Sequence, residues 1–109
     1  MNANDYQKAA LRTASRKDPQ ELILNGILGL SGEAGEVADH IKKHLFQGHE
    51  LDKRHIAEEL GDICWYIAIT AEAIGYSLGE VMQMNIDKLT KRYPNGFSKE
   101  NSLNRKDVE

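Results

Sequence analysis

Cysteine, proline and long apolar stretches are all scarce in this sequence of 109 residues. The single cysteine, Cys64, cannot form an internal disulfide, and its place in an apolar run predicts a buried thiol in a reducing compartment. That run, residues 63–69, is the longest apolar one, and its seven residues fall far short of the roughly 20 of a membrane-spanning helix. The first residues also lack the basic and apolar regions of a signal peptide. We therefore expect a cytoplasmic protein that does not bind or cross a membrane.

Charge of either sign is balanced. The chain has 14 Lys and Arg residues against 17 Asp and Glu residues, a net charge of −3, and no basic block. Because duplex nucleic acid requires a positive footprint, this distribution indicates small ligands as partners. The composition, with 40% hydrophobic and 28% charged residues, is typical of one modest folded domain spanning residues 1–109.

Proline occurs only at positions 19 and 94, and the interval between them is rich in helix-forming residues without strand-like alternation. The pattern predicts an all-α fold with helices over about residues 4–13, 20–47, 53–74 and 77–93. We expect breaks at residues 15–19, at the turn that starts with Gly48 and at Gly75. Residues 20–94 carry the motifs, and residues 95–109 form a polar arm or tail.

Short polar residues mark two predicted helix starts. Asp52 is placed to accept hydrogen bonds from the free amides of the third helix. Ser77 and Glu80 match the capping box at the start of the fourth helix.

Apolar stripes at helical spacing predict the core. They comprise Ile23, Ile27, Leu30, Val37, Ile41 and Leu45 on the second helix, Ile56, Leu60, Ile63, Ile67, Ala71 and Ile74 on the third, and Leu78, Val81, Met82, Ile86 and Leu89 on the fourth. Trp65 is assigned to the core or to an interface.

The second helix carries a glycine at every third position from Gly26 to Gly35. Each glycine costs a helix roughly 1 kcal/mol relative to alanine, so something must offset the loss. Gly26 and Gly29 lie beside the acidic face of this helix, which indicates that another helix or a ligand approaches there closely. A helix with two inner surfaces needs more neighbours than one short chain supplies, so we expect a homo-oligomer.

Two acidic pairs with i,i+3 spacing, Glu33 with Glu36 and Glu59 with Asp62, stand on consecutive helices joined by a short turn. A single such pair is usually a solvated helix face. An antiparallel hairpin, however, would bring the two pairs together into one oxygen-rich site, and oxygen ligands suit Mg²⁺ or Mn²⁺ rather than zinc.

The fourth helix supplies the opposite charge. Asn85 falls within its apolar stripe, and Lys88 and Arg92 follow on the flank, a row suited to polyphosphate oxygens or, alternatively, a solvated basic edge. His40 and His44 lie four residues apart, but with no third ligand nearby we expect surface histidines rather than a zinc site.

Three segments together resemble a known family. Residues 29–36 (GLSGEAGE), 58–62 (EELGD) and 88–94 (KLTKRYP) are similar to the MazG-like all-α nucleoside triphosphate pyrophosphohydrolases, whose pattern is Glu-x-x-Glu, a gap, then Glu-x-x-Asp. Here 22 residues separate Glu36 from Glu59, and the resemblance spans Asn25 to Pro94. The chain length accommodates one such domain rather than a tandem pair.

The resemblance implies a set of roles. Glu33, Glu36, Glu59 and Asp62 would be the catalytic Mg²⁺ ligands, and Tyr66, Asn85, Lys88, Arg92 and Tyr93 would bind substrate. The reaction would be Mg²⁺-dependent hydrolysis of an NTP or dNTP to the monophosphate and pyrophosphate, serving nucleotide-pool house-cleaning. Family members are dimers or tetramers, so a homodimer or homotetramer is expected. The alternative is a non-catalytic helical oligomer that binds a divalent cation or nucleotide as a regulatory module.

Overall fold

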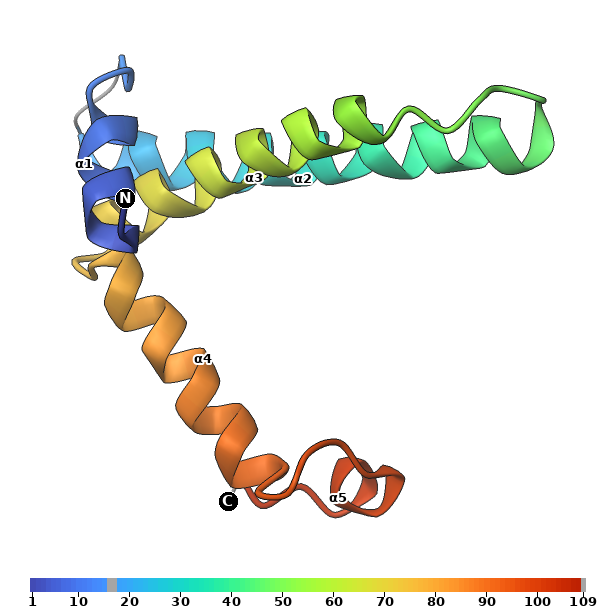
Figure 1. Ribbon diagram of the computed structural model, residues 1–109. Helices are drawn as coiled ribbons and strands as arrows, with labels where there is room; N and C mark the ends of the chain where they lie inside the picture. Colours follow the sequence, from blue (N-terminus) through green and yellow to red (C-terminus); the bar gives the residue numbers. More distant parts are fainter. Residues whose placement is uncertain (16–17, 109) are drawn as a thin grey trace. The chain divides into compact units, whose positions relative to one another are not determined.

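The computed structural model describes residues 1–15 and 18–108, so residues 16 and 17 of the predicted break and residue 109 lie outside the described part. Its helices are α1 (Ala3–Leu11), α2 (Pro19–Phe46), α3 (Lys53–Ala73), α4 (Leu78–Arg92) and α5 (Lys99–Leu103) (Figure 1). The described residues form no β-strand, which confirms the all-α class. The short α5 was not predicted and lies within the polar arm.

Side-chain caps explain where several helices begin. Asn2, Asp18 and Asp52 each accept a hydrogen bond from the backbone N–H three residues on, at 2.8, 3.1 and 3.0 Å, which confirms the predicted role of Asp52. Pro19 takes the first position of α2, where its missing N–H costs nothing, so α2 starts one residue earlier than predicted. At the predicted breaks, Gly48 and Gly75 adopt left-handed backbone conformations, with φ of 75° and 87°.

The chain divides into two compact units, residues 1–78 and 79–109. In the first unit, α2 and α3 lie side by side as an antiparallel hairpin, and α1 packs against α3 at the end away from the hairpin turn (Figure 1). The second unit holds most of α4 together with α5. No helix of the described residues is both long and apolar enough to span a membrane.

Two of the four glycines of α2 allow the close approach of α3. A Cβ atom added to Gly26 would overlap the hydroxyl of Thr70, and one added to Gly29 would overlap the ring of Tyr66. Gly32 and Gly35 face open space instead. The close contact predicted at Gly26 and Gly29 is therefore confirmed, and the approaching element is α3.

The core lies at the α1 end of the first unit. Ala10, Ala68 and Leu78 form one buried cluster, and Ala14, Leu22 and Ile69 form another. Trp65 packs against both clusters, and its indole N–H contacts the Ala10 carbonyl at 3.1 Å and the Thr13 hydroxyl at 2.8 Å. Of the two expected places for Trp65, the core or an interface, the structure supports the core, where the side chain is partly buried.

The buried side chain of Gln7 in α1 forms hydrogen bonds with backbone groups near the end of α3 and with the first residue of α4. Its amide nitrogen donates to the carbonyls of Ala68 and Tyr76, each at 3.2 Å, and its amide oxygen accepts the Leu78 N–H at 2.8 Å. All of these groups belong to the first unit, and the Leu78 N–H is one of the N–H groups at the start of α4 that have no partner within the helix.

Several predicted core positions are instead exposed. Leu60 and Ile74 are more than half exposed, as are Met82 and Ile86 of α4 and Leu45 of α2. The predicted burial of the Cys64 thiol is wrong, because Cys64 is exposed. The physical reason is that α3 packs against α2 and α1 through residues such as Tyr66, Ala68 and Ile69, so the face that carries Leu60 and Cys64 has no covering helix within this unit.

Candidate functional site

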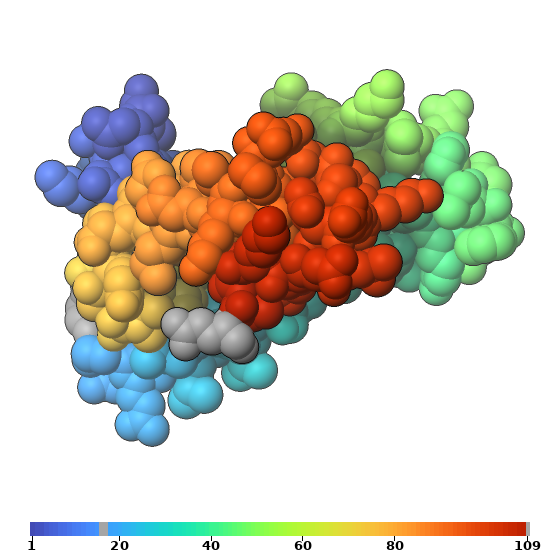
Figure 2. Space-filling model, turned by 90° about the horizontal axis from the view of Figure 1, so that it is seen from below, coloured from blue at the N-terminus to red at the C-terminus, as the bar shows by residue number. Residues whose placement is uncertain are grey.

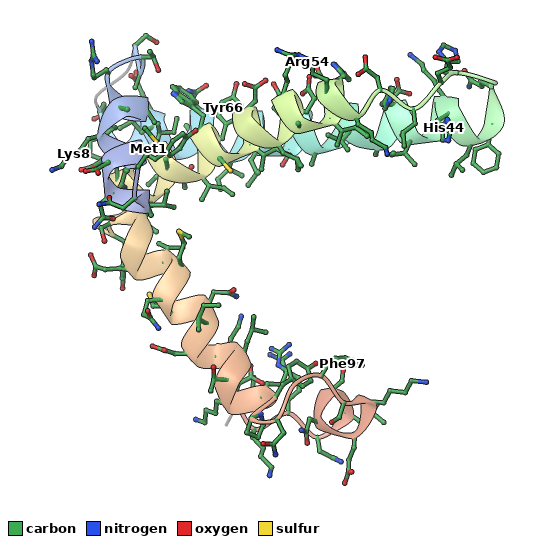
Figure 3. The ribbon with its side chains drawn as sticks, viewed as in Figure 1. Met1, Lys8, His44, Arg54, Tyr66 and Phe97 are labelled. Atoms are coloured by element: carbon green, nitrogen blue, oxygen red, sulfur yellow. The ribbon has the colours of Figure 1, made fainter. Side chains whose placement is uncertain are left out.

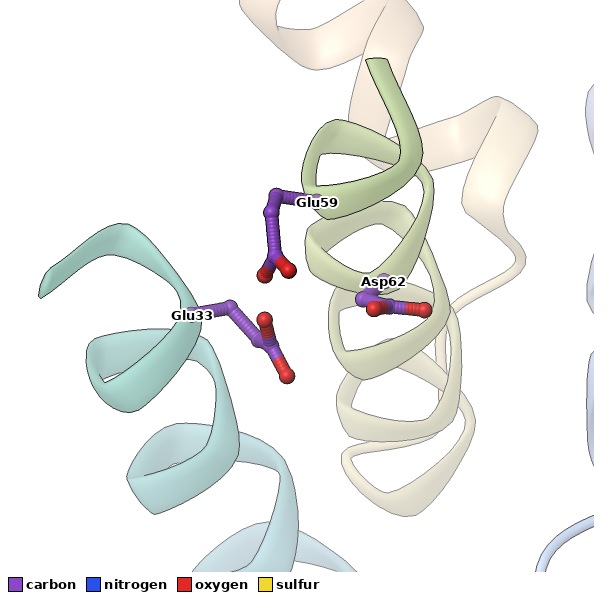
Figure 4. A group of neighbouring side chains, drawn as sticks. All are labelled: Glu33, Glu59 and Asp62. Atoms are coloured by element: carbon purple, nitrogen blue, oxygen red, sulfur yellow. The ribbon is translucent and has the colours of Figure 1, made fainter. Parts of the chain in front are cut away.

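The α2–α3 hairpin brings three of the four predicted carboxylates together. Glu33 on α2 points towards Glu59 on α3, with Asp62 one turn further along α3 (Figure 4). One oxygen from each of the three lies within 4.8 Å of the others. Gly29 is one turn before Glu33, so the tight helix approach at this glycine sets the distance between the facing carboxylates.

Asp62 is exposed, but the burial of the other two carboxylates makes this cluster different from a solvated acidic face. Glu59 is only 8% exposed, and Glu33 is half-buried. The Oε2 atoms of Glu33 and Glu59 are both buried without a hydrogen-bond partner. Leaving carboxylate oxygens desolvated and unpaired is costly, so the arrangement is suited to a ligand that supplies positive charge.

The pKa of Glu33 is raised above its ordinary value of 4.5. The first cause is the facing carboxyl of Glu59, which favours the protonated form through hydrogen bonding; burial and the negative charges of Glu59 and Asp62 add to it. A bound cation would replace that proton. The donor set consists of hard carboxylate oxygens, which fits Mg²⁺ or Mn²⁺.

Glu36, the fourth predicted ligand, lies one turn beyond Glu33 and outside the group of three. It is exposed and lines an open cavity of about 500 Å³. The other lining residues are Gly32, Gly35, Asp39, His40, Lys43 and His55. The absence of side chains at Gly32 and Gly35 therefore contributes to open space next to the carboxylates rather than to helix packing.

Two histidines of α2 contact the segment that connects α2 to α3. His40 Nε2 accepts the N–H of Asp52 at 3.0 Å, and His44 Nδ1 lies 2.8 Å from the carbonyl oxygen of His49. Figure 3 shows His44 at the end of the hairpin where the turn lies, well away from Tyr66. His40 and His44 thus both contact the connecting segment, which gives them a structural use that i,i+4 spacing alone did not reveal.

Sequence reasoning missed His55 as a neighbour of the site. Its Nε2 lies 3.7 Å from Glu59 Oε1, and its ring makes an edge contact with His40, with 5.5 Å between centroids. The i,i+4 spacing of His55 and Glu59 on α3 was the available signal.

Tyr66 lies one turn beyond Asp62, with its ring against Gly29 and edge-on to Trp65 at 5.2 Å between centroids. It therefore forms part of the helix contact. Its substrate-binding role stays a prediction.

The second unit holds the predicted phosphate-binding residues. Asn85 and Lys88 are exposed on α4. Arg92 is not freely solvated: its Nε and Nη2 atoms donate to the two carboxylate oxygens of Asp107 at 2.7 and 2.8 Å. Tyr93 is half-buried, with its ring 5.3 Å from that of Phe97 and the Arg92 guanidinium carbon 5.7 Å from its centroid.

Asp107 is the second residue that sequence reasoning missed. Its side chain is 1% exposed and also accepts two hydrogen bonds from Arg105, at 3.3 and 2.8 Å. In the space-filling view, the red residues near the chain end fold back onto the orange residues of the same unit (Figure 2). No local spacing signals a contact between residues 15 positions apart across a turn and a short helix.

These features define a class: an all-α protein that presents a partly buried, oxygen-only acidic cluster on a helical hairpin. The sequence profile described as "MazG nucleotide pyrophosphohydrolase domain" matches residues 23–97. The chain therefore belongs to the MazG nucleotide pyrophosphohydrolase domain family, as the resemblance implied.

Two curated relatives have similar sequences. The "Gene 37 protein" of Mycobacterium phage L5 is 33% identical over 114 residues, covering 96% of this chain and all of the phage protein. The "Uncharacterized protein YvdC" of Bacillus subtilis strain 168 is 36% identical over 73 residues, covering 59% of this chain and 69% of the relative. No solved structure matches the chain significantly.

Proposed function

We propose that this chain is a Mg²⁺-dependent nucleoside triphosphate pyrophosphohydrolase, which converts an NTP or dNTP to the monophosphate and pyrophosphate. The observation that carries the proposal is the pair of buried, unpartnered oxygens on Glu33 and Glu59, beside Asp62 in a chain of this family. A protein that used these carboxylates only for solubility would leave them in water.

Glu33, Glu59 and Asp62 hold the cation in this proposal, and Glu36 joins them from the next turn of α2. Mg²⁺, or Mn²⁺ in its place, would supply Lewis-acid polarisation of phosphoryl oxygens and lower the pKa of a water. One of the four carboxylates takes the proton of the attacking water as the new P–O bond forms and the bond to pyrophosphate breaks.

Cationic and polar residues bind the substrate. Lys88 and Arg92 neutralise the charge that develops on the leaving pyrophosphate. Tyr66, Asn85 and Tyr93 contact the nucleotide. The enzyme acts in the cytoplasm on canonical or damaged nucleotides as a house-cleaning activity.

We further propose that the two units belong to one MazG domain and that the protein is a homodimer or homotetramer. The exposed apolar side chains support this assembly, because so many large ones rarely remain in water on a small monomer. They include Leu24, Ile27, Leu28, Leu60, Ile74, Met82 and Ile86.

The test is release of both pyrophosphate and nucleoside monophosphate from a panel of canonical and modified NTPs and dNTPs, with Mg²⁺ and with EDTA. Metal-dependent release of both products is expected. If every nucleotide survives at high protein concentration with Mg²⁺ or Mn²⁺ present, the enzyme hypothesis is wrong. The protein is then a non-catalytic module that binds a cation or a nucleotide.

A further inference from the structure

One carboxylate in the second unit holds two guanidinium groups. Asp107 lies between Arg92 and Arg105, and each arginine binds it through the same edge, Nε together with Nη2. Paired hydrogen bonds of this kind fix the plane of a guanidinium as well as its position. The two arginine side chains, from α4 and from the segment after α5, are therefore held next to each other.

The exposures of the three side chains differ in a useful way. Asp107 is 1% exposed, Arg92 is 17% exposed and Arg105 is 42% exposed. The negative charge is thus covered, while the positive side chains that cover it still reach the solvent. Two guanidinium groups around one carboxylate leave a net charge of about +1 on the outside of the cluster.

The number of N–H donors on the two arginines also suits an anionic ligand. A guanidinium has five N–H donors, and Asp107 takes two from each arginine, which leaves up to three on each for another acceptor. The pKa of Asp107 is lowered, first by its hydrogen bonds from Arg92 and then by those from Arg105, so the carboxylate stays charged and keeps both arginines in place at working pH.

We propose that Asp107 is a positioning residue that assembles Arg92 and Arg105 into a two-guanidinium binding group for polyphosphate, so that Arg105 is a further phosphate-binding residue. The role in catalysis rests on the proposed function, because the polyphosphate is then that of the nucleotide substrate. The binding group itself does not depend on turnover.

The opposite role for Asp107 is a competitor that occupies Arg92 in place of phosphate. The two roles predict effects of opposite sign. Removing a negative charge near an anion site ordinarily strengthens anion binding. If Asp107 positions the arginines, its removal weakens binding despite that gain.

The experiment measures binding of inorganic tripolyphosphate by isothermal titration calorimetry in EDTA, using the full-length chain and the variants Asp107→Asn and Asp87→Asn. Asp87 is a matched control, an exposed α4 aspartate that accepts a hydrogen bond from Gln83 at 2.8 Å. We expect Asp107→Asn to weaken binding about tenfold and Asp87→Asn to leave it unchanged or slightly tighter. Nucleotide turnover should show a rise in KM together with a fall in kcat, because Arg92 also neutralises charge on the leaving pyrophosphate.

A second variant covers the case in which Asp107→Asn disturbs the fold. Arg105→Gln removes an exposed side chain and should weaken tripolyphosphate binding several-fold, whereas Arg54→Gln, an exposed α3 arginine paired with Glu58, should not. Circular dichroism and thermal unfolding check that each variant is folded.

Three results would overturn the inference. Tighter binding by Asp107→Asn would show that Asp107 competes with phosphate for the arginines. Unchanged binding by both Asp107→Asn and Arg105→Gln would show that the contact serves only the fold. No binding of tripolyphosphate by the unmodified chain would show that the two arginines do not form a binding group. Product release from NTPs is measured separately, so failure of the enzyme proposal is distinguishable from failure of this one.

Discussion

Buried carboxylates occur in both units of the chain, but in opposite circumstances. In the second unit, Asp107 is surrounded by two guanidinium groups, and its pKa is lowered. In the first unit, Glu33 faces Glu59, the Oε2 atom of each is buried without a hydrogen-bond partner, and the pKa of Glu33 is raised. The chain itself supplies cations for Asp107, whereas the buried Oε2 atoms of Glu33 and Glu59 have no partner within it. Uncompensated burial is the stronger indication of a ligand, because the fold gains nothing from it otherwise.

The largest expected effect is on turnover. Glu59→Gln keeps the size of the side chain but removes its charge from the proposed cation site, so pyrophosphate release with Mg²⁺ should fall by at least about 100-fold. Glu58→Gln is the matched control, since Glu58 is an exposed neighbour paired with Arg54, and it should keep activity within about twofold. Equal activity of the two variants would contradict the proposed site.

Added Mg²⁺ should stabilise the chain through the unpartnered cluster. At a concentration 100 times the Kd, binding to the folded state alone contributes about 2.7 kcal/mol, which corresponds to a rise in Tm of roughly 10 °C. Glu33→Gln should lose this rise, whereas Asp107→Asn should keep it. Differential scanning fluorimetry with Mg²⁺ and with EDTA measures both, and an equal rise in Glu33→Gln would remove the cluster as the binding site.

The contact that places Glu33 opposite Glu59 should be sensitive at only some glycines. Gly29→Ala forces a methyl group into the Tyr66 ring, and Gly26→Ala forces one into Thr70, so each should destabilise the fold by about 1–3 kcal/mol. Gly32→Ala meets open space and should be neutral or stabilising by up to about 1 kcal/mol. Urea unfolding compares the three, and a Gly32→Ala variant as unstable as Gly29→Ala would refute the packing.

Stability against pH should separate the two kinds of carboxylate. The raised pKa of Glu33 means that its protonated form stabilises the folded chain below 4.5, and that this contribution is lost as pH rises through the higher folded value. The lowered pKa of Asp107 gives a contribution that is present above 3.8 and lost as pH falls through the lower folded value.

Urea unfolding in EDTA between about pH 3 and pH 8 measures both trends. Metal-free Glu33→Gln should gain stability over the unmodified chain as pH rises. The deficit of Asp107→Asn should stay nearly constant down to about pH 4 and begin to shrink only below it, because the folded pKa of Asp107 lies far below 3.8. A flat difference for Glu33→Gln across this range would show that the facing carboxyls do not interact.

The sequence predicted those parts of the fold that depend on neighbouring residues. Helix starts at Asp52 and Ser77, the glycine turns and the close approach at Gly26 and Gly29 follow from local geometry, and the structure agrees on the helix bounds to within about two residues. The grouping of Glu33, Glu59 and Asp62 was predictable because a short turn forces α2 and α3 to be antiparallel neighbours.

Burial was predicted less well. Helical periodicity identifies the apolar stripe of α3 but does not show which element covers it. Leu60 and Cys64 were therefore predicted to be buried, although both are exposed in the single chain. The Arg92–Asp107 contact was also beyond prediction, since it depends on how the segment after α4 folds back. Local rules carry no information about that path.

Anomalous X-ray diffraction from crystals of the chain grown with Mn²⁺ tests the central claim most directly, because it locates the cation without reference to activity. We expect a manganese peak between the carboxylates of Glu33, Glu59 and Asp62, within about 2.5 Å of their oxygens. A peak elsewhere, or none at this cluster with Mn²⁺ in excess, would contradict the claim that the unpartnered carboxylates are a cation site.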